Sequence, residues 1–213
     1  MTGRRILEFG GVVAGVVMIA FGIGALVMSF NARNTVSDGL KLELIVGSAD
    51  MSSTGITKPM KEAGLQNVAV PTCDVAEQPI ESGSDARCFA EYMRIHALEA
   101  SGGLTYAQMG RFLAADDPTN PKGTSDEAVA LKDEKGKPVS NSARNTWVTA
   151  TALGTALNVS YMAEQIALFG VIVGIALLLS GIGFVILALI VLGTAARKES
   201  AGARKIQTTP TTV

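Results

Sequence analysis

The residue types that most often carry catalysis are scarce in this sequence. Its 213 residues include one histidine, His96, and two cysteines, Cys73 and Cys88. A Ser-His-Asp set would have to form around His96, but no G-x-S-x-G turn presents a nucleophilic serine. His96 falls on the apolar stripe of a predicted helix, a position more typical of a core or interfacial histidine than of a catalytic one. We therefore predict no catalytic residue and a protein that is not an enzyme.

Patterns typical of metal sites are missing from the sequence as well. A zinc site needs four cysteine or histidine ligands at close spacing, and the chain offers two cysteines and one histidine. One acidic group lacks the fixed spacing of a calcium-binding loop and is more typical of a solvated surface; it comprises Asp116, Asp117, Asn120, Asp126 and Glu127. We predict no metal site and no cofactor.

The segment from His96 to Tyr106 is open to two interpretations. In the structural one, a helix ends at the glycine pair 102–103, which tolerates a positive φ, and Thr105 caps the next turn. In the functional one, His96, Glu99 and Tyr106 converge around the turn to bind a polar ligand. Local turn chemistry already accounts for these residue types, so the structural interpretation is favoured.

Cys73 and Cys88 both fall in the central part of the chain. A disulfide between them would close a loop of about 15 residues and contribute about 3 kcal/mol in the chain-entropy model. The alternative is a pair of unrelated buried thiols. Because the chain has no other cysteine, and because both lie in the segment that we expect outside the cytoplasm, we predict the disulfide.

Two long uncharged apolar runs bracket these residues and must position them. The runs extend from Phe9 to Phe30 and from Ile166 to Ala196, and each exceeds the roughly 20 residues that an α-helix needs to cross a bilayer. We predict transmembrane helices at 9–30 and 166–194. The first run is longer than the roughly 7–15 residues of a signal-peptide core and ends without a small-x-small cleavage site, so an uncleaved anchor is favoured over a signal peptide.

The charges that flank the two runs predict the orientation of the chain. The predicted tails, 1–8 and 195–213, are net positive, whereas residues 31–165 carry twelve basic and seventeen acidic side chains. Basic residues in short segments beside a span stay on the cytoplasmic side. We therefore expect a two-pass plasma-membrane protein with both termini in the cytoplasm and the domain 31–165 outside it.

The central segment is predicted to be mainly helical. Short and long helices are expected near 58–64 and over 85–100, and the second places an apolar stripe on Phe89, Met93, His96 and Ala100. Turn-forming residues dominate 116–142, which we interpret as an irregular surface loop.

A further helix should begin near Asn141 or Ser142 and meets no breaker before the second run, so one helix of about 50 residues is predicted. An extension of the first span toward Leu44 would allow the two extensions to pair. The predicted fold is an all-α membrane protein with two transmembrane helices joined by a mostly helical extracytoplasmic domain, the second span being continuous with a long stalk helix.

Small residues inside the runs predict close helix packing. Gly11 and Gly15 are four residues apart in the first run, as are Gly170 and Gly174 in the second. This spacing allows two helix backbones to approach closely. The alternative is that glycine is simply frequent in membrane helices. A contact between the two spans and a contact between protomers satisfy the pattern equally well.

Three parts of the chain form a recognisable pattern: the segment 96–108, HALEASGGLTYAQ, residues 149–163 and the glycine-rich second run. With this pattern the chain resembles a family of small actinobacterial membrane proteins. Members have an N-terminal span, an extracytoplasmic domain with an H-x-L-E-A-T-G-G-K-T-Y-A-like motif and a C-terminal span; here Ser101 and Leu104 replace the threonine and lysine. The resemblance implies no established activity. Some members bear an aromatic ring-opening dioxygenase label, but such an iron site needs two histidines and a carboxylate, which a chain with one histidine cannot supply alone.

The two runs contain no charged residue, which disfavours transport because transporters usually keep ionisable groups at membrane depth. The leading prediction is a non-enzymatic scaffold or accessory subunit that presents its external domain to an envelope partner. The alternatives are an oligomeric pore or transport component and a ligand sensor that signals along the second helix. We expect contact with the lipid bilayer, a second copy or an unidentified membrane or envelope protein as partner, and no nucleic acid.

Overall fold

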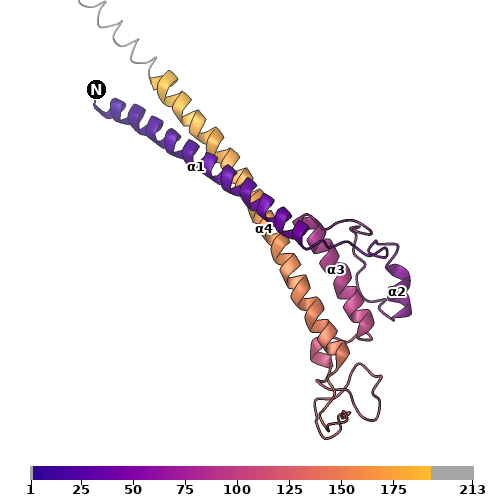
Figure 1. Cartoon of the computed structure of the whole chain (residues 1–213). Coiled ribbons are helices and arrows are strands. Elements are labelled where there is room, and N and C mark those ends of the chain that lie inside the picture. Colours follow the sequence, from indigo (N-terminus) through magenta and orange to yellow (C-terminus); the bar gives the residue numbers. More distant parts are fainter. Residues whose placement is uncertain (1, 193–213) are drawn as a thin grey trace, which may run out of the picture. The chain divides into compact units, whose positions relative to one another are not determined.

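A computed structural model describes residues 2–192 of the chain, and side chains over 9–190 (Figure 1). The described residues are mostly helical and contain no β-strand, in agreement with the predicted all-α class. The predicted basic tail at 195–213 and the last two residues of the predicted second span lie outside the described residues. The chain divides into two compact units. We call Arg33–Gln165 the loop domain, and the described residues on either side of it the helix pair.

Two long helices supply the helix pair and continue into the loop domain. Helix α1 spans Thr2–Leu42, so it passes through the first apolar run and ends two residues before the predicted limit at Leu44. Helix α4 spans Ser142–Ile186 and continues as a π-helical segment, Leu187–Leu192. This agrees with the predicted single helix of about 50 residues. The helix is not interrupted because the stretch contains no proline. Both helices are long and apolar enough to cross a membrane, by length and composition alone.

Helix α2, Thr57–Glu62, and helix α3, Gly83–Ala100, lie in the loop domain. Helix α3 begins two residues before the predicted start because Ser82 and Asp85 form a capping box, each side chain accepting the other's backbone N–H at 3.1 Å. It ends as predicted at a glycine pair, Gly102 and Gly103, whose φ angles are 62° and 79°. A single 3₁₀ turn, Tyr106–Gln108, follows.

The predicted apolar stripe on α3 is confirmed in part, because Phe89 belongs to the core and Met93 packs against it. Of its four residues only Phe89 is buried, whereas Met93 and His96 are half-buried and Ala100 is exposed. The helix buries a much wider surface because it is covered on two sides, by α4 and by the segment that leads into it. Its buried residues are Gly83, Ala86, Cys88, Phe89, Ala90, Tyr92, Ile95, Ala97 and Leu98.

The residues from Met109 to Asn141 form no helix and are joined by isolated backbone bridges, such as Phe112 with Thr124 and Ala114 with Ala130. This agrees with the irregular loop predicted over 116–142. The hydrophobic core of the loop domain lies elsewhere, where α1, α2, α3 and α4 meet. Its members include Leu40, Ile56, Met60, Ile80, Phe89, Tyr92, Ile95, Trp147 and Leu157.

Candidate functional site

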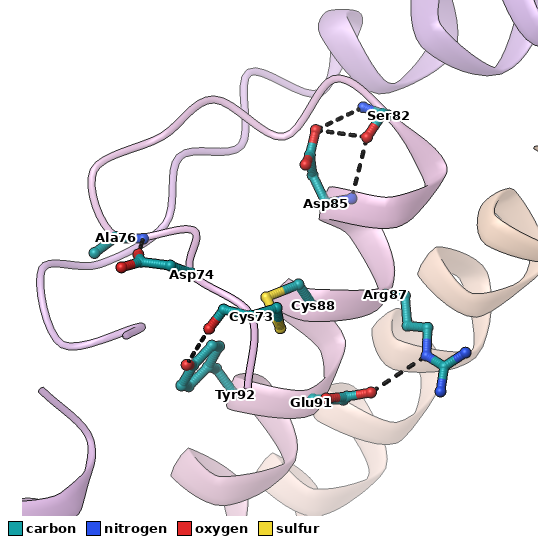
Figure 2. The surroundings of a disulfide bond; sticks show 9 residues. All are labelled: Cys73, Asp74, Ala76, Ser82, Asp85, Arg87, Cys88, Glu91 and Tyr92. Atoms are coloured by element: carbon teal, nitrogen blue, oxygen red, sulfur yellow. Dashed lines mark hydrogen bonds and ion pairs between the residues drawn. A yellow bond between two sulfur atoms is a disulfide. The ribbon is translucent and has the colours of Figure 1, made fainter. Parts of the chain in front are cut away.

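The two cysteines tie α3 to the segment before it (Figure 2). Cys73 and Cys88 form a disulfide with a sulfur–sulfur distance of 2.08 Å, which fits the prediction. One turn further along α3, the buried Tyr92 donates its hydroxyl hydrogen to the Cys73 carbonyl at 2.7 Å. Burial, and then the nearby carboxylates of Asp74 and Glu91, raise the pKa of Tyr92. One covalent bond and one hydrogen bond therefore hold this corner together.

His96 lies in a polar cluster on the other end of α3. Its Nδ1 is 2.9 Å from a carboxylate oxygen of Glu99, and its Nε2 is 3.6 Å from Asp50, in the loop after α1. Ser48 donates a hydrogen bond of 2.6 Å to Asp50. The structure thus brings together two of the three residues proposed to bind a polar ligand, His96 and Glu99, and adds Asp50.

Tyr106, the third of those residues, contacts a different side chain. It is 45% exposed, and the guanidinium of Arg144 lies 3.9 Å from the centre of its ring. The His96 cluster also has no serine or cysteine in hydrogen-bonding contact with the imidazole among the described contacts. Among the described side chains of residues 9–190, no group of three or more histidine, cysteine or carboxylate residues is arranged so that it could hold a metal ion.

The acidic group of the irregular loop holds turns together. Asp117 accepts hydrogen bonds from the backbone and hydroxyl of Thr119, and these bonds lower its pKa. Asn120 accepts from the Lys122 backbone, and Asp126 accepts from that of Ala128. These side chains are exposed, and their printed hydrogen bonds stay within their own loop, as is typical of turn-forming Asp and Asn.

Asn141 connects the irregular loop to α4. Its side-chain amide donates to the carbonyls of Gly110 and Pro121 at 3.1 and 2.8 Å. Its side-chain oxygen accepts from the backbone of Ala143 and Arg144, which caps the helix. The side chain is fully buried. The predicted start of the helix is therefore also the anchor of the preceding loop.

Within the helix pair, α1 and α4 contact each other through a seam of small residues. A Cβ added to Gly15 would lie 2.7 Å from the Gly181 carbonyl oxygen, and one added to Gly174 would lie 3.0 Å from that of Gly22. Gly11 faces Ala188 and Gly170 faces Ser29 in the same way. All four glycines predicted to pack thus lie at a contact between the two helices of one chain.

The buried positions of this seam recur every seven residues. They are Gly15, Gly22 and Ser29 on α1, and Ala167, Gly174, Gly181 and Ala188 on α4. A seven-residue repeat keeps one helix face against its partner over several turns. Many of the large apolar side chains of the two helices are exposed instead, among them Phe9, Phe21, Val27, Phe169, Leu179 and Ile190.

Glu164 joins three helices of the loop domain. One oxygen of its carboxylate accepts a hydrogen bond of 3.2 Å from the backbone N–H of Ser84, at the start of α3. The other oxygen lies 3.5 Å from the Arg33 guanidinium on α1. Gly83 makes this approach possible, because a Cβ there would lie 2.8 Å from the Cα of Tyr161. We call Arg33, Ser84 and Glu164 the Glu164 junction.

Three large apolar side chains are exposed where α1 ends. Leu42, Leu44 and Val46, which we call the apolar edge, are 83%, 85% and 58% exposed. Leu44 has a φ of 51°, in the left-handed region that glycine usually occupies after a helix. A leucine in this conformation costs about 1–2 kcal/mol. The chain therefore accepts backbone strain at a residue whose apolar side chain faces solvent.

Comparison with family models, with curated proteins and with solved structures finds no match to this chain. The site must therefore be interpreted from its geometry alone.

Sequence reasoning missed Asp50, Glu164, the apolar edge and the seven-residue spacing of the seam, for different reasons. Asp50 and Glu164 gave no local signal, because their partners are far away in the sequence. The apolar edge was hidden inside an expected helix extension. The seven-residue spacing of Gly15, Gly22 and Ser29 was visible in the sequence and could have predicted the seam.

Proposed function

We propose that this protein is a non-enzymatic membrane scaffold or accessory subunit whose loop domain binds a protein partner through the apolar edge. In this proposal the loop domain lies outside the cytoplasm and the helix pair lies in the plasma membrane. We propose membership of the actinobacterial two-span family on the motif at 96–108. The observation that carries the proposal is Leu44, which is 85% exposed and held at a φ of 51°.

Strain of this kind persists only where the surrounding structure imposes it, and it concentrates at functional positions. Glycine at 44 would end α1 without strain and without exposing an apolar side chain. Leu42 and Val46, on either side, are also exposed. Exposed apolar side chains that occur together are typical of interaction surfaces, whereas scattered ones need no explanation.

The helix pair supports an anchoring role. Many of its small residues lie in the contact between α1 and α4, and many of its large apolar side chains are exposed and free to face lipid. The described parts of the two apolar runs contain no charged residue. A pore would need a lining that water or ions can wet. These features favour an anchor over the pore that the sequence left open.

A photoactivatable benzoyl-phenylalanine at Leu44 tests the proposal in native membranes. A discrete crosslinked protein is expected at this position, and none from a matched probe at the exposed Lys135. Charging the neighbours in the same chain, with Leu42→Glu and Val46→Glu, should remove the adduct. The proposal fails if Leu44 captures no protein, or if Leu44 and Lys135 capture the same proteins to the same extent.

The Glu164 junction favours a second candidate function, a ligand sensor. Glu164 lies two residues before the second apolar run and holds the start of α3. A ligand that displaces α3 would therefore act on α4 at the membrane end of the domain. In Glu164→Ala, hydrogen exchange at the Ser84 amide should rise about fivefold, for a loss of about 1 kcal/mol. Glu164→Gln keeps an acceptor and should change less. Equal exchange in all three proteins would contradict this coupling.

A further inference from the structure

A groove of about 540 Å³ lies within the loop domain, between the end of α1 and the first half of α4. Val36, Leu40 and Ile45 line one wall, and Leu153, Leu157 and Val159 line the other. Leu40 and Leu157 also belong to the buried core. The groove is therefore an apolar extension of the core that the chain leaves open.

Small residues keep the groove open. A Cβ added to Gly39 would meet no atom within 4 Å, although Gly39 lines the groove. Ala156 and Ala163 occupy lining positions on the facing helix. Larger apolar residues at these positions would have filled the space and added burial, at about 25 cal/mol for each Å² removed from water. The small residues therefore forgo the stabilisation that larger apolar side chains in the groove would provide.

The lining determines which ligands the groove suits. Among its lining residues, all of them described, Glu43 is the only charged one. A single carboxylate without a basic neighbour suits neither an anion nor a metal ion. The Ser160 hydroxyl already donates to the Ala156 carbonyl at 3.4 Å. Apart from Thr35, the rest of the lining is hydrocarbon. The volume of the groove falls within the roughly 300–1,000 Å³ of small-molecule sites.

The position of the groove along the two helices indicates where such a hydrocarbon comes from. Ala163 is three residues before the second apolar run, and Thr35 is five residues after the first. At a rise of about 1.5 Å per residue these gaps are about 4.5 and 7.5 Å of helix. The headgroup layer on each side of a bilayer is about 5–7 Å thick. A chain leaving the bilayer core can therefore enter the groove without crossing bulk water.

We propose that this groove holds an acyl chain of a bilayer lipid. The inference is independent of the proposed partner surface, because Leu42, Leu44 and Val46 do not line the groove. The residues that alternate with them along the chain, Glu43 and Ile45, line the groove. The two proposals therefore rest on different side chains, and this one also rests on the proposed placement of the helix pair in the membrane.

Labelling with a photoactivatable lipid tests this proposal on the full-length protein. The protein is placed alone in nanodiscs of phosphatidylglycerol that contains a diazirine in one acyl chain. After irradiation, label is expected on peptides covering 35–45 and 153–163 as well as on the apolar runs. In Gly39→Trp, label on the groove peptides should fall about tenfold. This is the loss of affinity expected when roughly two methylene groups of the acyl chain lose their burial. Label on the runs should not change.

Gly24→Trp is the matched control, because Gly24 also lies on α1 with no atom within 4 Å of an added Cβ. It should leave labelling of the groove unchanged. Ala156→Trp plugs the groove from the facing wall and replaces Gly39→Trp if that variant does not form the Cys73–Cys88 bond. The proposal is overturned if the groove peptides of the unaltered protein carry no label, or if a plugged and correctly folded variant is labelled equally.

Discussion

Asn141 uses its full side-chain hydrogen-bonding capacity inside the loop domain, with two N–H groups donating and one oxygen accepting twice. Asn141→Ala should lower the free energy of unfolding by about 1–3 kcal/mol, because two carbonyls and the first turn of α4 lose their partners. Thermal unfolding of the protein in nanodiscs measures the change. Asn145→Ala, at an exposed position one turn later, should have little effect. Equal melting temperatures for both variants would contradict the assignment.

Tyr92 makes the stability of the domain sensitive to alkaline pH. Burial raises its pKa above the ordinary value of about 10. Its contribution is therefore complete below that value and is lost as pH rises through the folded-state pKa. Unfolding measured from pH 8 to 11 should show a loss of stability above pH 10 that is smaller in Tyr92→Phe. The exposed Tyr106→Phe should retain the loss. A pH profile of Tyr92→Phe that matches the unaltered protein would refute this.

At the scale of elements, the seam makes the two long helices an internal hairpin. A cysteine pair in Gly11→Cys and Ala188→Cys should crosslink within one chain when membranes are oxidised. An added Cβ at Gly11 would lie 3.1 Å from the Ala188 Cβ, so a shift of a few tenths of an ångström reaches the roughly 3.5–4.5 Å that a disulfide spans. Adding Gly174→Ile should suppress the crosslink severalfold, since a side chain there meets Leu26 and the Gly22 backbone. Gly183→Ile, at a position with open space, should not. Crosslinks only between chains would show that the seam joins protomers instead.

The same elements show what the sequence could predict. The C-terminal end of α1, both ends of α3 and the start of α4 were close to expectation because caps, glycines and the absence of proline are local signals. The buried face of α3 was not, because it depends on two neighbours that a periodic pattern on one helix does not reveal. The His96 cluster was predicted only in part for a similar reason. Glu99 is one helical turn from His96 and was predicted, whereas Asp50 is distant in the sequence and reaches His96 only through the fold.

At the scale of the whole molecule, the disulfide and the flanking charges make the same prediction about topology. A disulfide persists in an oxidising compartment, and basic tails favour the cytoplasmic side. Both predict that the loop domain lies outside the cytoplasm. A cysteine introduced as Lys135→Cys should react with an impermeant maleimide in intact cells. Cysteines introduced as Thr2→Cys or Ser200→Cys should react only after permeabilisation. The two native cysteines should stay unlabelled until a reductant is added, because they are bonded to each other. The reverse pattern would place the domain in the cytoplasm, where neither the disulfide nor the proposed envelope partner would be available to it.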